Sequence, residues 1–254
     1  MRRPSRGSLA QAVALLVLLG GASCAIDQES RPRQDLAPLI DRELSMSAGA
    51  ADVGPREGIA AVLLVDVSGS MDDEIGRGDE RKIVIARRAA LDLVRQFEAY
   101  AEAHPDEPVL IGLYEFSGSA AASTREVIPL AAPDPGAAKS ALARMRPDGG
   151  TPIGAAMIAA TRTLDQSNLS RRHLLVITDG ENTDGYAPDD VMAGLGRRPE
   201  AARPSVYFVA FDIAATRFDG VRNAGGLVLE AADAKELNQT LDFLLNGKIL
   251  VEAP

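Results

Sequence analysis

The positions of apolar and polar residues predict alternating strands and helices from residue 59 onward. Residues 59–65 form a continuous apolar run that ends at Asp66, which is typical of a central strand buried on both faces. Over residues 80–104 apolar side chains recur every three or four positions, which predicts an amphipathic helix. The same reasoning predicts strands over 109–116, 126–130, 173–178, 205–211 and 227–231, and helices over 135–145, 152–165, 188–195 and 234–245.

This alternation favours a three-layer, doubly wound α/β fold with a mostly parallel central sheet, in a domain over residues 58–250. The strand over 126–130 follows the strand over 109–116 with no helix between them. We therefore expect it to be an antiparallel edge strand. In a sheet of this kind ligands bind at the carboxyl ends of the strands, where the strand order reverses.

The N-terminal residues have a different pattern, which is typical of a secretory signal. Residues 1–8 carry three arginines and no acid, residues 9–19 are almost wholly apolar, and small residues then precede Cys24. The apolar run is shorter than the roughly 20 residues of a membrane span. We expect residues 1–23 to be a signal peptide. Residues 24–57 contain prolines, glycines and charges and predict a flexible tether, with a short helical piece near residues 36–44.

The signal resembles that of a bacterial lipoprotein, in which the first cysteine after the cleavage point is acylated. One departure is Gly21, which stands where such signals usually have leucine. The resemblance implies that Cys24 is lipidated and that the protein is an extracytoplasmic lipoprotein of the cell envelope, in contact with the membrane only through its N-terminal lipid anchor. In the alternative, an ordinary signal peptidase cuts after Ala25 and leaves a soluble secreted or periplasmic protein.

Composition and charge narrow the function classes. Apolar residues make up 46% of the chain and charged residues 25%, which are ordinary values for a soluble globular protein. The net charge of −9 argues against nucleic acid as a main partner. The charged residues among 1–23 are all arginines, so loss of this segment would make the protein more acidic. One cysteine and two histidines leave little room for a zinc site or histidine-based catalysis.

Three loops carry oxygen-bearing side chains at predicted strand ends or helix starts. They supply Asp66, Ser68 and Ser70 from the first loop, Thr151 from the second and Asp179 from the third. These are hard oxygen ligands with two negative charges, a set that favours Mg²⁺, Ca²⁺ or Mn²⁺ over zinc or copper. Because hydroxyls outnumber carboxylates, we expect an octahedral ion that keeps bound waters, with Mg²⁺ as the first choice.

Taken together, Asp66-x-Ser68-x-Ser70, Thr151 after two glycines and Asp179 in Thr-Asp-Gly resemble the metal-ion-dependent adhesion site of a von Willebrand factor type A domain. The resemblance covers about residues 58–248 and includes a Rossmann-like fold. It implies that the three hydroxyls ligate the ion and that the two aspartates act mainly through bound waters. It also implies an open coordination position, which an Asp or Glu of a protein partner would fill.

Each loop also has a simpler interpretation when it is taken alone. Thr151 before Pro152 suits the N-cap of a helix. The Asp179-Gly180 pair suits a turn at a strand end, and residues 68–70 suit an ordinary loop. In a further alternative, the site keeps these residues but no longer needs a metal.

The sequence favours a binding module over an enzyme. A phosphatase of the haloacid dehalogenase type needs a second aspartate two residues after the first, and here that residue is Ser68. The chain has no Gly-x-Ser-x-Gly elbow, phosphate-binding loop or dinucleotide fingerprint. We therefore predict an extracytoplasmic module that binds a protein partner through a divalent metal. The alternatives are a metal-dependent hydrolase that uses the same site and a scaffold that assembles without metal.

Overall fold

The computed structural model describes residues 36–45, 55–75, 80–118 and 123–252. Within these residues, the strands form a single mixed sheet in the order β3-β2-β1-β4-β5-β6. Their bounds are β1 Arg56–Asp66, β2 Val109–Phe116, β3 Thr124–Ala131, β4 Leu169–Thr178, β5 Ser205–Phe211 and β6 Leu227–Ala231. The neighbours of β1, β4 and β5 are parallel, and β3 pairs antiparallel with β2 at the edge. The prediction of a mostly parallel sheet with one antiparallel edge strand is confirmed.

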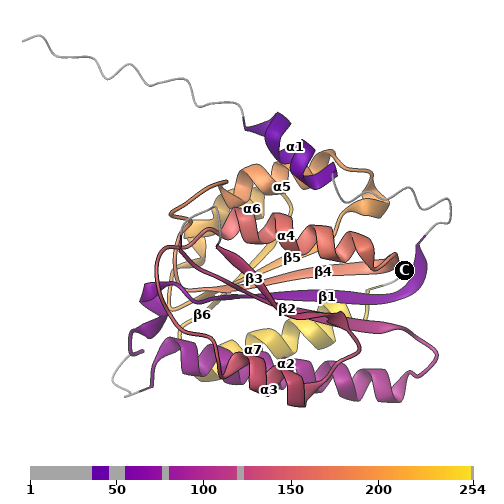
Figure 1. Ribbon diagram of the computed structural model, residues 1–254, viewed down its shortest axis with the longest axis horizontal. Coiled ribbons are helices and arrows are strands. Elements are labelled where there is room, and N and C mark those ends of the chain that lie inside the picture. The colour runs from indigo at the N-terminus through magenta and orange to yellow at the C-terminus, as the bar shows by residue number, and fades with distance from the viewer. Residues whose placement is uncertain (1–35, 46–54, 76–79, 119–122, 253–254) are drawn as a thin grey trace, which may run out of the picture. The chain divides into compact units, whose positions relative to one another are not determined.

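Helices cover both faces of the sheet, so the domain has three layers (Figure 1). Successive residues of β1 point to opposite faces: Leu63 and Val65 join one apolar cluster, and Val62 and Leu64 join the other. Each of these side chains is fully buried, which stabilises the fold by about 1.5–3 kcal/mol per residue. One face carries α2 (Lys82–Ala103), α3 (Pro135–Leu142) and α7 (Ala234–Leu244); the other carries α1 (Ala37–Ser45), α4 (Ile153–Gln166), α5 (Pro188–Arg197) and α6 (Asp219–Asn223).

The strand order places the switch point of the sheet, which we call the crevice, at the carboxyl ends of β1 and β4. From the central β1 the chain adds β2 and β3 on one side and then β4, β5 and β6 on the other. The connections therefore leave β1 and β4 in opposite directions, which is the arrangement that opens a ligand crevice in doubly wound sheets. Val65 lies opposite Ile177 in the parallel ladder, so the loops that follow these two strands begin side by side.

Part of the segment predicted as a tether is folded onto the domain. Helix α1 buries Ile40 and Leu44 completely or almost completely, and Ile40 packs against Gly194 of α5. An ion pair of 2.7 Å between Arg197 and Asp41 adds a polar contact. The helical piece predicted near residues 36–44 is thus present, but its apolar face makes it a part of the domain, so the prediction of a flexible tether over 24–57 is wrong for this helix.

The signal segment and Cys24 lie outside the described residues. Within the described ranges, none of the helices combines the length and the apolar character that crossing a bilayer requires. Short helical turns complete the described fold: η1 Gly69–Asp72, η2 Glu200–Ala202, η3 Ala215–Phe218 and η4 Leu245–Ile249.

Candidate metal centre

The loop after β1 is organised by the aspartate at the end of that strand. The backbone N–H of Ser68 donates to Asp66 Oδ1 at 2.7 Å, which folds the chain back toward the carboxylate. The turn η1 then brings the hydroxyls of Ser68 and Ser70 to 3.2 Å from each other. This loop is tied to the next one, since the N–H of Gly69 donates to the carbonyl of Gly149 at 3.0 Å.

Asp66, the last residue of β1, is wholly buried. Burial raises the pKa of its carboxyl to about 7, although hydrogen bonds from Thr178 and Ser68 favour the charged form. The Thr178 hydroxyl donates to Asp66 Oδ2 at 2.5 Å. Thr178 is the last residue of β4, so this bond joins the two strand ends on either side of the crevice.

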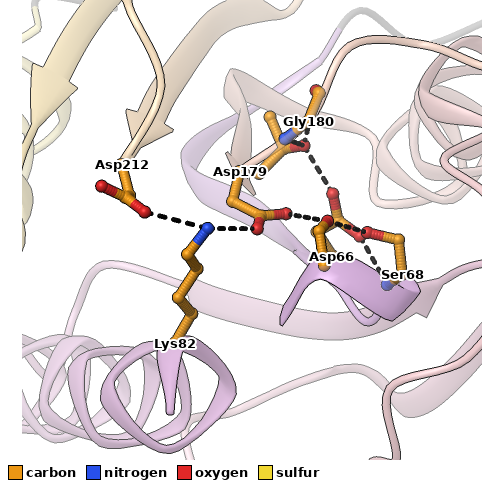
Figure 2. A network of polar contacts seen from close by, with 8 residues as sticks. Asp66, Ser68, Lys82, Asp179, Gly180 and Asp212 are labelled. Carbon is orange, nitrogen blue, oxygen red and sulfur yellow. Dashed lines mark hydrogen bonds and ion pairs between the residues drawn. The ribbon is translucent and has the colours of Figure 1, made fainter. Parts of the chain in front are cut away.

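Asp179 lies directly after β4, and its two carboxylate oxygens have different partners (Figure 2). Oδ1 accepts a hydrogen bond of 2.8 Å from the Ser70 hydroxyl. Oδ2 accepts a hydrogen bond of 3.0 Å from the ammonium of Lys82. The first contact closes a chain of oxygens that runs from Ser68 through Ser70 to Asp179.

Thr151 completes the group from the loop before α4. Its N–H donates to the hydroxyl of Thr183 at 2.7 Å, and its carbonyl accepts from the N–H of Thr183 at 3.0 Å. Its own hydroxyl lies beside the backbone of Gly180: a Cβ built on Gly180 would stand 3.4 Å from Thr151 Oγ1 and 3.9 Å from Ser70 Oγ. Helix α4 begins at Ile153 after Pro152 without a side-chain cap, so the N-cap interpretation of Thr151 is wrong.

The structure therefore brings all the predicted site residues to one edge of the sheet, although they come from three separate loops. The donor set is two carboxylates and three hydroxyls. Among the described residues, this edge of the sheet included, no group of three or more His, Cys, Asp or Glu is placed to hold a metal. A cation here would depend on the hydroxyls and on bound waters, and hydroxyls and carboxylates are the oxygen donors that suit Mg²⁺, Mn²⁺ or Ca²⁺.

One residue of the site was not predicted. Lys82, the first residue of α2, is 7% exposed and forms ion pairs of 3.0 Å with Asp179 and 2.9 Å with Asp212. Burial alone would lower the pKa of Lys82, but hydrogen bonds and charge attraction from Asp212 and Asp179 outweigh it and raise the pKa. Sequence pattern gives no signal for this role, because a lysine at the start of an amphipathic helix is usually exposed.

A hollow of about 200 Å³ opens beside the third loop. Its lining includes Glu181 and Asn182, which follow Asp179 closely in the chain, and the apolar side chains of Phe218 and Val221. At its rim Arg217 forms an exposed ion pair of 3.0 Å with Glu181. A hollow with polar and apolar lining therefore lies next to the five oxygen-bearing side chains, which we call the oxygen cluster.

Comparison with known proteins gives a family match over part of the chain and a likeness of fold to solved structures. Residues 61–181 match the family model of the von Willebrand factor type A domain. The PilB minor pilin from Streptococcus sanguinis matches with a TM-score of 0.59 at 14% identity, over 80% of this chain and 64% of that chain. A von Willebrand factor type A structure from Catenulispora acidiphila gives a TM-score of 0.55 at 21% identity, over 73% of this chain and 41% of that one.

The pilus adhesin SpaC from Lactobacillus rhamnosus matches with a TM-score of 0.58 at 15% identity, over 78% of this chain and 30% of the adhesin. This chain therefore spans less than two thirds of each of these three structures. At such identities the likeness is one of fold. A search of curated proteins finds no significant match.

Proposed function

Because the chain carries a von Willebrand factor type A domain, we propose that it is an extracytoplasmic module that binds a protein partner through a divalent cation. The observation that carries this proposal is the convergence of Asp66, Ser68, Ser70, Thr151 and Asp179 on one crevice. Mg²⁺ is the expected ion, with Mn²⁺ or Ca²⁺ as alternatives. When bound, it would supply a positive centre for a carboxylate of the partner.

In this proposal the hydroxyls of Ser68, Ser70 and Thr151 hold the ion, and Asp66 and Asp179 orient its waters. The loops are already fixed by backbone hydrogen bonds: Gly69 N–H to Gly149 O at 3.0 Å, and Thr183 N–H to Thr151 O at 3.0 Å. The oxygens are therefore largely in place before an ion arrives. Preorganisation of this kind strengthens binding because little conformational entropy is lost.

The charge of the chain bears on how an acidic partner would be recognised. A protein with net charge −9 repels an acidic partner at long range. A bound divalent ion would offset this repulsion locally, so the partner would be attracted only where one of its carboxylates reaches the ion. The hollow beside the third loop, with Phe218 and Val221 in its lining, could take a neighbouring side chain of the partner. Similar folds occur in a minor pilin and a pilus adhesin, which accords with a binding role.

The placement of the two histidines favours binding over hydrolysis at this site. His173 is buried in β4, where it pairs with Ser205 at the start of β5. His104 follows the C-terminal end of α2, whereas Lys82 at the other end of that helix contacts the crevice. Neither imidazole is therefore placed to act as a general base beside the oxygen cluster.

Titration calorimetry with MgCl₂ tests the metal site. We expect binding heat from the wild type and none from a Ser68→Ala, Ser70→Ala double variant. A Ser45→Ala, Ser140→Ala variant is the matched control, because both hydroxyls are exposed and bond only to carbonyls of their own helices. Equal heats from the site variant and the wild type would refute the site.

The partner class is tested with peptides. We expect Mg²⁺-loaded protein to bind members of an immobilised peptide array that contain Asp or Glu, and to lose them when those residues are replaced by Asn or Gln. A chelator should release the same peptides. Binding that persists in chelator would instead support the metal-independent scaffold.

A further inference from the structure

Lys82 stands on one side of Asp179, and the oxygen cluster stands on the other. Figure 2 shows the ammonium between Asp179 and Asp212, while Asp66 and Ser68 lie beyond Asp179. Asp179 Oδ2 faces the ammonium and Oδ1 faces the Ser70 hydroxyl. The carboxylate that would serve a divalent ion therefore already has a cation as a neighbour.

This contact is part of a buried arrangement rather than a surface ion pair. The side chain of Lys82 is 9% exposed and that of Asp179 is fully buried. The second acid, Asp212, follows β5 directly and has a φ of +56°. Its N–H donates to the carbonyl of Ala231 at 2.8 Å. The ammonium is thus held by two acids that follow neighbouring parallel strands, which keeps its position fixed.

We propose that Lys82 is a built-in counter-cation that holds Asp179 in place before the divalent ion binds and keeps the affinity for that ion low. This inference rests on the proposed function, since it concerns the same site. The fixed ammonium repels a second cation on the far side of the Asp179 carboxylate. It also partly neutralises the negative charge of Asp179, so the electrostatic attraction of the crevice for a cation is weaker. Removing one partner of a buried pair would also leave a charge uncompensated.

Low intrinsic affinity has a consequence for partner binding. A carboxylate from the partner would add the negative charge that Lys82 offsets, so the ion and an acidic ligand would each raise the affinity for the other. Such coupling is reciprocal by thermodynamic necessity. The domain would then bind the ion by itself, but more tightly when its partner is present.

Calorimetry with MgCl₂ at pH 8 tests the inference. We expect Lys82→Met to bind Mg²⁺ roughly tenfold more tightly than the wild type, because one repelling charge is gone. The control is Lys248→Met, which removes the same charge from an exposed lysine over the Phe243 ring. This lysine lines the same hollow as Ser205, the first residue of β5, at the end of that strand opposite Asp212. Its affinity should stay within about twofold of the wild type, as expected for a distant, screened charge. Without Mg²⁺, Lys82→Met should melt at a lower temperature than Lys248→Met.

Asp212→Asn gives a second test that does not need the lysine removed. Asparagine accepts the positive φ at this position, and the side chain of Asp212 is 39% exposed. The variant leaves Lys82 with one acid fewer, so its charge acts more strongly on the crevice. Mg²⁺ affinity should fall by roughly threefold, opposite in direction to Lys82→Met.

The outcomes separate this inference from the proposed function. If the wild type and Lys82→Met bind Mg²⁺ with equal affinity, the counter-cation role is refuted and the metal site stands. If neither protein gives binding heat, the metal site fails and this inference fails with it. If Lys82→Met does not fold, Asp212→Asn decides, and an unchanged or tighter affinity refutes the role of Lys82.

Discussion

Acidification should destabilise the domain through His173, a residue remote from the candidate metal centre. Its imidazole is fully buried in β4, and among the described residues neither ring nitrogen has a hydrogen-bond partner. The nearest acid is Glu252, whose Oε2 lies 3.5 Å from Nδ1. Burial, with a smaller contribution from the charge of Arg171, lowers the pKa of His173 from 6.5 to about 3.

The sign and size of the effect follow from this pKa. Above pH 6.5 the ring is neutral in both states and contributes no pH dependence. Below pH 6.5 the imidazole of the unfolded chain binds a proton, whereas the imidazole of the native protein does so only near pH 3. The free energy of unfolding therefore falls as the pH is lowered from about 6.5 to about 3. The loss is about 1 kcal/mol at pH 5.5 and about 3 kcal/mol at pH 4.5.

Urea unfolding of the wild type and His173→Leu, both in chelator, measures this loss. Replacing an unpaired buried imidazole by an apolar side chain should change stability at pH 8 by no more than about 1 kcal/mol. Between pH 8 and pH 4.5 the variant should gain about 3 kcal/mol relative to the wild type. Taking the difference between the two proteins cancels the titration of groups that they share. A difference that stays constant with pH would refute the buried neutral histidine.

Three further predictions concern the site and the anchor. Thr183→Val should cost about 1–3 kcal/mol in urea unfolding and weaken Mg²⁺ binding, because the N–H of Thr151 loses its acceptor; Thr183→Ser should restore both, and equal behaviour of the two variants would contradict this. Gly154→Ala should cost about 1–3 kcal/mol and lower the melting temperature, because the added methyl would overlap the carbonyl of Tyr186; an unchanged melting temperature would argue against the close packing. In a bacterial host Cys24→Ala should move the protein from the membrane to the soluble fraction, whereas an unchanged distribution would exclude a lipid anchor at this residue.

Most of the fold could be predicted from the sequence because buried strands and amphipathic helices leave distinct periodic patterns. The boundaries of β2 and β5 were predicted to the residue. The start of β4 was missed by four residues because Arg171 and Arg172 interrupt its apolar run. The ladder nevertheless continues through both arginines, which pair with Glu107 and with Asp165. Ion pairing of this kind depends on the tertiary fold and has no local signature.

The short segment between β5 and β6 shows a second limit of the pattern. Turn η3 and helix α6 span Ala215–Asn223, a stretch too short and too mixed in polarity to show a helical period. Phe218 holds it in place by packing on Phe208, with ring centroids 5.3 Å apart. The N–H of Ala215 also donates to Glu230 Oε2 at 2.9 Å, and Val221 is buried, so contacts with the rest of the domain hold a segment that has no helical period of its own.

The sequence predicts that the oxygen-bearing side chains of the candidate site gather at one edge of the sheet. It does not predict the contacts that hold them there. The carboxyl ends of parallel strands meet at one edge, so Asp66 and Asp179 were expected to be neighbours. The contacts that position Thr151 run partly through backbone atoms and through Thr183, 32 residues away. The burial of Lys82 depends on where α2 begins relative to the sheet edge, which periodicity alone cannot fix.

A site that brings carboxylates together to bind a cation must remain folded when the cation is absent, although the negative charges then repel each other. Asp66 and Asp179 meet this need in different ways, although they flank the same crevice. Burial makes the charged form of Asp66 costly and raises its pKa to about 7, so a proton can neutralise it. Asp179 instead has the ammonium of Lys82 at 3.0 Å, and the raised pKa of Lys82 keeps that charge in place through neutral pH. An incoming Mg²⁺ would therefore compete with a proton at one aspartate and with a fixed ammonium at the other, and substitution of Lys82 should alter ion affinity on both sides of pH 7.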